Sequence, residues 1–203
     1  MKFWMHGLFA GSLAGALWAG MWQLVLTMVL IVTTGAPLSL QLGPAVLTGI
    51  SVGVIAMTMR RDGPLRRHLI GAVLTGLLLF GFSLGSPFDP QGLVTVWQSG
   101  LFLVMNAIVI WFSISATVGN TPATRLTRYL AEIFYLRLLW GQGLMLFVLI
   151  VAIPFYVMVM TSLKNQQSLL LNPLDFSIDP TVGADVLFGS YICLLYTSDA
   201  ADE

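Results

Sequence analysis

The sequence predicts an all-α, polytopic membrane protein with about five transmembrane helices and a cytoplasmic amino terminus. Hydrophobic residues make up 57% of the 203-residue chain and charged residues only 9%, whereas soluble domains carry roughly 25% charged residues. Apolar stretches of membrane-spanning length recur along the chain. They are continuous blocks, unlike the alternating segments of about ten residues that build a β-barrel. We therefore expect helices surrounded by lipid, with their backbone groups paired internally.

Five stretches have the composition of a membrane helix, which needs about 20 apolar residues to cross the hydrocarbon core. The first is longer than the core of a secretion signal, which is roughly 7–15 residues, so we interpret it as a retained helix. The second and third are short and rich in glycine, so their ends are the least defined. The predicted spans are 7–32, 43–59, 68–85, 93–118 and 140–162.

The basic residues predict the orientation of these spans. Eight of the nine Lys and Arg residues lie before the first span, between the second and third, or between the fourth and fifth. Lys164 alone lies on the other side. Because basic loops stay in the cytoplasm, we expect the crowded side to be cytoplasmic and the segment after residue 162 to be outside. The net charge of zero gives no basic field for nucleic acid.

Small residues recur every fourth position at the start of the first span, as Gly7, Gly11, Gly15 and Ala19. This spacing makes a flat helix face and favours close packing against another helix. The alternative is that glycine is simply common in membrane helices.

Polar side chains are few inside the predicted spans. For Gln23, Gln98 and Asn106, hydrogen bonding to another helix is favoured over lining a substrate path. The spans hold no ionisable residue at mid-membrane, which argues against an ion-coupled carrier.

The remaining reactive side chains give no sign of a catalytic or metal site. His6 and His68 lie near helix ends, where an interfacial position is expected, because a metal site needs several converging ligands. One cysteine excludes an internal disulfide. The sequence contains no hydrolase, metalloprotease, phosphate-loop or dinucleotide motif, so we expect neither an enzyme nor a bound cofactor.

The apolar pattern changes near residue 120. Thr121 is a candidate helix cap with Pro122 in the first turn. Leu126, Leu130, Ile133 and Phe134 then repeat at helical spacing. They indicate either an amphipathic helix on the inner membrane surface or an extension of the fifth span. We expect a four-helix module of unrecognised family over 1–120 and a second domain over 121–192.

The fifth span contains Pro154 and passes directly into a polar segment, with Tyr156 toward its outer end. This stretch resembles the first core helix and outer loop of sugar-importer permeases of the ATP-binding-cassette class, most closely the maltose-type inner-membrane subunit. That family commonly shows a Pro-Phe-Tyr-x-x-x-x-(Thr)-Ser-(Phe/Leu)-Lys pattern. The corresponding residues here are Pro154, Phe155, Tyr156, Thr161, Ser162, Leu163 and Lys164.

The resemblance covers about 145–191. Within it, Ser190 stands where the family often has an asparagine, which weakens the correspondence there. The resemblance implies a subunit of an ATP-driven carbohydrate importer in the bacterial plasma membrane. Its partners would be a second permease subunit, a cytoplasmic ATPase dimer that binds the ATP, and an extracytoplasmic solute-binding protein. The alternative is a structural or anchoring membrane module with no transport role.

The last residues, 193–203, read CLLYTSDAADE. They match one translation frame of a transposase adapter used in sequencing libraries. We interpret them as an artefact tail and expect the gene to continue into further spans and a cytoplasmic loop with a Glu-Ala-Ala signature. A genuine acidic tail is the alternative.

Overall fold

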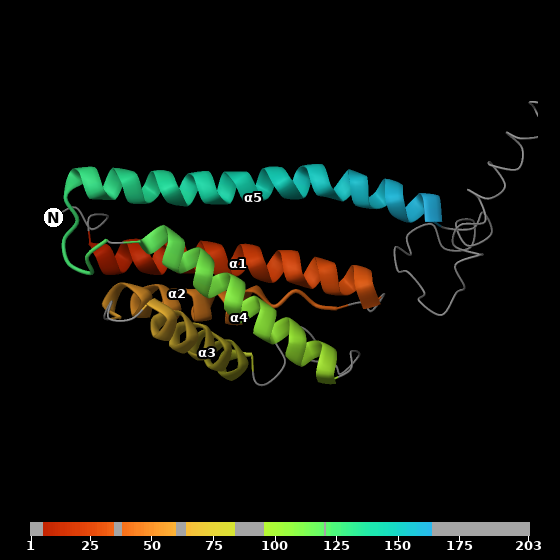
Figure 1. The fold of residues 1–203 in the computed structure, drawn as a ribbon, viewed down its shortest axis with the longest axis horizontal. Helices are drawn as coiled ribbons and strands as arrows, with labels where there is room; N and C mark the ends of the chain where they lie inside the picture. Colours follow the sequence, from red (N-terminus) through yellow and green to blue (C-terminus); the bar gives the residue numbers. More distant parts are fainter. Residues whose placement is uncertain (1–5, 35–37, 60–63, 84–95, 120, 164–203) are drawn as a thin grey trace, which may run out of the picture. The chain divides into compact units, whose positions relative to one another are not determined.

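The computed structural model describes residues 6–34, 38–59, 64–83, 96–119 and 121–163. All regular structure in these ranges is helical, and the β-type pairing there is one isolated bridge between His6 and Arg125. The helices are α1 (Gly7–Thr34), α2 (Leu42–Thr58), α3 (Pro64–Phe82), α4 (Val96–Val118) and α5 (Arg128–Leu163) (Figure 1).

The protein is therefore an all-helical membrane protein. Among the described residues, four helical segments are long and apolar enough to cross a bilayer: Gly7–Ile31, Leu65–Phe82, Val96–Val118 and Arg128–Val159. The helix α2 is equally apolar but has 17 residues, which is about 26 Å at the α-helical rise. It falls slightly short of the roughly 30 Å hydrocarbon core.

The predicted spans correspond to these helices, with one large difference. The fifth helix begins at Arg128 rather than at residue 140. From Arg128 onward, the segment with the apolar repeat and the fifth span form one continuous helix. This is the alternative in which the segment extends the fifth span. The apolar stripe of this helix packs against protein, since Ala131, Phe134 and Leu138 are buried. Leu126, which is also buried, precedes the helix.

The predicted cap at Thr121 is wrong. Gly119 has a φ of 49° and ends α4, and the Thr121 hydroxyl donates a 2.6 Å hydrogen bond back to the Val118 carbonyl. The chain is not helical from residue 121 to 127, and Thr127 Oγ1 accepts a 3.4 Å hydrogen bond from the Leu130 amide as the cap of α5. Tertiary pairing explains the difference, because the Thr124 carbonyl accepts a 3.0 Å hydrogen bond from the Gly7 amide.

The chain divides into two compact units, and the division falls inside α5. The first contains Met1–Ile31 and Ala36–Leu144, and the second contains Val32–Gly35 and Met145–Glu203. The described part of the second unit is chiefly the carboxy-terminal half of α5. The predicted domain boundary at residue 120 stays a prediction.

In the first unit α1 contacts both α2 and α4. It runs antiparallel to α2, because Gly11 approaches Gly53 while Gly15 approaches Gly49. It also runs antiparallel to α4, since Trp18 bonds to Thr117 whereas Gln23, further along α1, bonds to Asn106. The described contacts of the first unit therefore join α1 to α2 and to α4, and α3 to α2 and to α4.

Candidate functional site

The closest helix contact joins α1 and α2 through glycines. A Cβ added at Gly15 would overlap the Gly49 carbonyl, and one added at Gly11 would lie 2.9 Å from the Gly53 carbonyl oxygen. The two backbones are in direct contact, as small residues four apart allow. Two of the three glycines singled out in the sequence thus lie on this contact.

Gly7 has a different neighbour. A Cβ at Gly7 would overlap the Pro122 carbonyl and lie 2.9 Å from the Thr124 carbonyl oxygen. Gly7 therefore packs against the non-helical segment before α5 rather than against a helix. The recurring small residues of α1 therefore serve two contacts.

A row of polar contacts joins α1 to α4. Trp18 Nε1 donates a 2.8 Å hydrogen bond to Thr117 Oγ1, and Trp22 Nε1 donates a 2.8 Å bond to Ser113 Oγ. Next along the interface, Asn106 Nδ2 donates a 2.7 Å bond to Gln23 Oε1. These bonds satisfy polar groups that neither lipid nor apolar side chains could satisfy.

The predicted role of Gln23 and Asn106 in bonding between helices is confirmed. Both side chains are fully buried, and each reaches the other rather than a cavity. Two buried oxygens nearby, Asn106 Oδ1 and Thr27 Oγ1, have no hydrogen-bond partner among the described atoms. The α1–α4 interface is therefore polar around Gln23 and Asn106, and both side chains are shielded from solvent.

A second cluster holds α3 to α4. Trp111 Nε1 donates a 3.2 Å hydrogen bond to His68 Nδ1, and the His68 ring stacks on Phe112 with centroids 5.0 Å apart. A Cβ at Gly71 would overlap the Trp111 ring, so this glycine makes room for the indole. His68 lies near a helix end as expected, but its contacts were not foreseen, because nothing local pairs it with α4.

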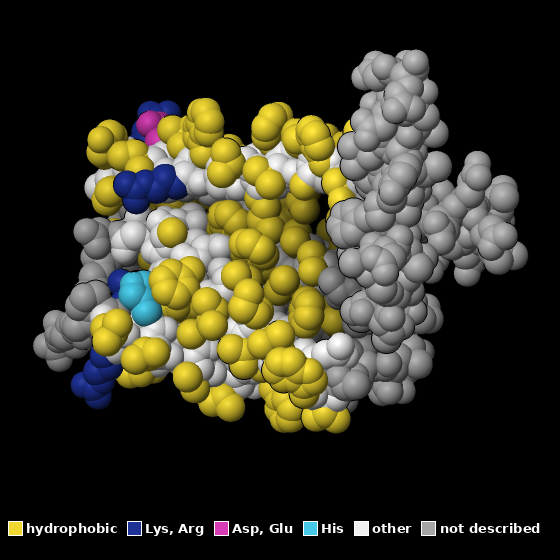
Figure 2. Space-filling view, turned by 45° about the vertical axis from the view of Figure 1, so that its right-hand side comes forward, with side chains coloured by type: hydrophobic (Ala, Val, Ile, Leu, Met, Phe, Trp, Pro, Cys, Tyr) yellow, Lys and Arg dark blue, Asp and Glu magenta, His cyan; other side chains and the backbone are white. Residues whose placement is uncertain are grey.

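The basic side chains of the described residues lie at one end of the first unit. The backbone of Arg125 forms an isolated β-bridge with that of His6, just before α1, and Arg67 Nη2 lies 3.5 Å from the Ala56 carbonyl oxygen near the end of α2. Figure 2 shows Lys, Arg and His side chains toward one end of the visible face and hydrophobic side chains over much of the rest. The assignment of the basic loops to the cytoplasm stays a prediction.

The permease-like motif begins in the carboxy-terminal half of α5. Pro154 is inside the continuous helix, where its missing amide removes one helical hydrogen bond. Pro154 and Phe155 are exposed and Tyr156 is partly exposed. Thr161 and Ser162 lie in the last turn of α5, but their side chains are outside the described ones, and Lys164 lies outside the described residues.

The arrangement holds helices together rather than assembling reactive groups. Among the described residues, no three His, Cys, Asp or Glu side chains are close enough to share a metal ion. The described acidic side chain Glu132 is exposed and lies 3.8 Å from Arg128 Nε one turn earlier. Comparison with protein-family models, with curated proteins and with solved structures finds no match.

For the contact between α1 and α2, the sequence indicated the residues of α1 but not their partners on α2. Gly11 and Gly15 stand out by spacing, whereas Gly49 and Gly53 were not singled out. They are also four residues apart, and a search of every span for this spacing would have found them.

Proposed function

We propose that the chain is part of the permease subunit of an ATP-driven carbohydrate importer in a bacterial plasma membrane. The observation that carries this proposal is the motif that runs from Pro154-Phe155-Tyr156 to Thr161-Ser162-Leu163-Lys164 at the outer end of a membrane-spanning helix. The partners in this proposal are a second permease subunit, a cytoplasmic ATPase dimer and an extracytoplasmic solute-binding protein. ATP is bound by the ATPases, not by this chain.

The surface of α5 supports the proposal. From Leu144 to Val159 the helix is apolar on every side, and most of its side chains are exposed. Exposed large residues there include Phe147, Ile150 and Phe155. A helix that is apolar all round belongs in lipid or among other membrane helices, and a permease that pairs with a second subunit would provide both.

A structural or anchoring module is the second candidate, and the first unit supports it. The tryptophan, glutamine and asparagine side chains between α1 and α4 bond to one another. A hollow of about 480 Å³ between α3 and α4 is lined by apolar residues. A sugar path requires polar groups directed at the solute, whereas the hydrogen bonds between α1 and α4 direct polar side chains at the neighbouring helix.

The test is affinity purification of the product of the complete gene, expressed together with the genes beside it. The importer proposal predicts co-purification of an ATPase and a second permease. It also predicts ATP-dependent accumulation of a radiolabelled sugar, with maltose as the first probe, in reconstituted vesicles. A gene product that purifies without an ATPase and takes up no sugar would reject the importer in favour of the anchoring module.

A further inference from the structure

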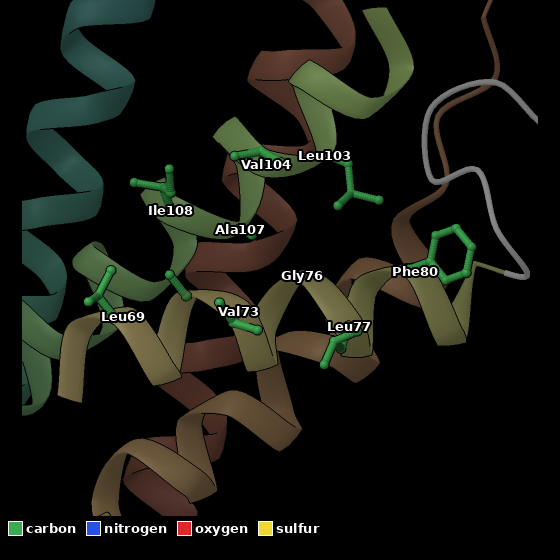
Figure 3. Close-up of a pocket in the computed structure, with 10 residues that line it drawn as sticks. Leu69, Val73, Gly76, Leu77, Phe80, Leu103, Val104, Ala107 and Ile108 are labelled. Carbon is green, nitrogen blue, oxygen red and sulfur yellow. The ribbon is translucent and has the colours of Figure 1, made fainter. Parts of the chain in front are cut away.

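An apolar groove runs along the outside of α3 and α4. It has a volume of about 480 Å³, within the range of small-molecule sites. Its floor is made by small residues, Ala72, Gly76 and Ala107. Figure 3 shows the larger side chains along it, which come from both helices: Leu69, Val73, Leu77, Phe80, Leu103, Val104 and Ile108.

The groove lies in two membrane-spanning helices and opens outward. Leu69, Val73 and Leu77 on its α3 side are 61%, 63% and 65% exposed. Leu69 and Phe80 are about 16 Å apart along the axis, because an α-helix rises about 1.5 Å per residue. This length is about half of the roughly 30 Å hydrocarbon core, which is the depth that one lipid acyl chain occupies.

A positive charge lies at one end of the groove. Arg66 is exposed and precedes Leu69 by three residues, so it falls on the same face of α3 as the groove. On α4, Phe112 follows Ile108 by four residues and stacks on His68 at this end. No acidic side chain occurs in the described part of α3 or in α4, so nothing on either helix neutralises Arg66.

We propose that this groove binds one anionic phospholipid from the leaflet at the basic end of the protein. One acyl chain of this lipid lies on Ala72, Gly76 and Ala107, between the larger side chains of α3 and α4. Its headgroup phosphate lies beside Arg66. Basic residues at the ends of membrane helices commonly select anionic headgroups. The proposal does not depend on whether the protein transports sugar.

The shape of the groove favours a lipid over a partner helix. Closely packed membrane helices meet on flat faces of small residues, as Gly15 and Gly49 do here. In this groove the small residues lie beneath projecting Leu and Val side chains, which leaves a channel for a thin, flexible chain. A second copy of the protein or another helix is therefore an outcome that the experiment must separate.

The test is native mass spectrometry of the full 203-residue chain. The chain is first equilibrated with mixed micelles of equal amounts of phosphatidylglycerol and phosphatidylcholine. We expect one retained lipid per chain, with phosphatidylglycerol preferred. Arg66→Gln should reduce this preference about fivefold, since one basic residue near the membrane surface contributes roughly that factor. The matched control Arg128→Gln removes an exposed arginine on α5 and should leave the preference unchanged.

Two further variants test the groove itself. Val104→Trp places a bulky ring in the α4 wall at an exposed position and should abolish retention of both lipids. Gly76→Ala should retain them, because its Cβ would lie at ordinary contact distances, 3.5 Å from Ala107 Cβ and 3.7 Å from Leu103 Cδ2. A circular dichroism spectrum like that of the wild type would establish that each variant is folded.

Several results would overturn the proposal. One is equal retention of phosphatidylglycerol and phosphatidylcholine by the wild type. Another is an equal loss of the preference for phosphatidylglycerol in Arg66→Gln and Arg128→Gln. The third is unchanged lipid retention in folded Val104→Trp. Retention of a second protein copy in place of lipid, lost in Val104→Trp, would assign the groove to a dimer contact instead.

Discussion

At the scale of single residues, the contact between Gly15 and Gly49 is the least tolerant point of the first unit. Gly15→Ala would force the α1 and α2 backbones apart, because the new Cβ would overlap the Gly49 carbonyl. We expect a loss of about 1–3 kcal/mol in the free energy of unfolding, as for overpacked cores. Titration with sodium dodecyl sulfate, followed by circular dichroism, measures it.

Gly20→Ala is the matched control, in the same helix and with the same chemical change. A Cβ at Gly20 would have as its nearest neighbour Val46 Cγ2, at 3.8 Å, so the helix should tolerate it or gain slightly from the better helix former. Equal effects of the two substitutions would show that α1 and α2 are not in backbone contact.

The bond between Gln23 and Asn106 should be measurable as a coupling energy. Replacing each residue by leucine, singly and together, isolates the interaction in a double-mutant cycle. Hydrogen bonds between membrane helices average about 0.6 kcal/mol and reach about 1.7, and we expect a value within this range from the 2.7 Å bond.

A second cycle provides the control for this coupling. Thr75 lies on α3 and donates within its own helix to the Gly71 carbonyl, so Thr75→Val and Gln23→Leu should be additive. Coupling near zero between Gln23 and Asn106, or equal coupling in both cycles, would contradict the contact.

At the scale of elements, the start of α5 can be tested by comparing two threonines. Thr127→Ala removes the cap and should destabilise the first turn by about 0.5–1 kcal/mol, the lower part of the range for caps, because its hydrogen bond is long at 3.4 Å. Hydrogen exchange of the amides of residues 128–131 should accelerate.

Thr121→Ala should leave exchange in this turn unchanged, because Thr121 bonds to Val118 at the end of α4. Faster exchange at residues 128–131 in Thr121→Ala, but not in Thr127→Ala, would show that Thr121 is the cap, as the sequence predicted.

The elements also show what a sequence can and cannot reveal. The spans follow from apolar length alone, and the glycine face of α1 follows from its spacing. The start of α5 was misplaced because Thr121-Pro122 carries the local signal of a helix start. The backbone hydrogen bond from Gly7 to Thr124 joins residues far apart in the chain. It holds the segment between α4 and α5 in a non-helical conformation. The groove between α3 and α4 was missed for a related reason, since small residues on two helices form a floor only after pairing.

At the scale of the whole molecule, the main features of the described residues are an apolar exterior and basic side chains gathered toward one end of the first unit. Both could be predicted from composition and from the order of basic loops. The permease-like motif was also visible in the sequence, but its function depends on partner subunits, so the importer remains a proposal. The hydrogen bonds that close the α1–α4 interface depend on three-dimensional pairing, which composition does not encode.

The central claim is that apolar helices cross the membrane and place the basic loops in the cytoplasm. Labelling of intact bacterial cells with a membrane-impermeant maleimide tests it most directly. In a Cys193→Ser background, single cysteines are placed at Ser39 before α2 and at Thr124 before α5, both exposed positions. We expect labelling at position 39 in intact cells, and labelling at position 124 only after the membrane is permeabilised. Equal labelling of both positions in intact cells, or labelling of position 124 alone, would contradict the account.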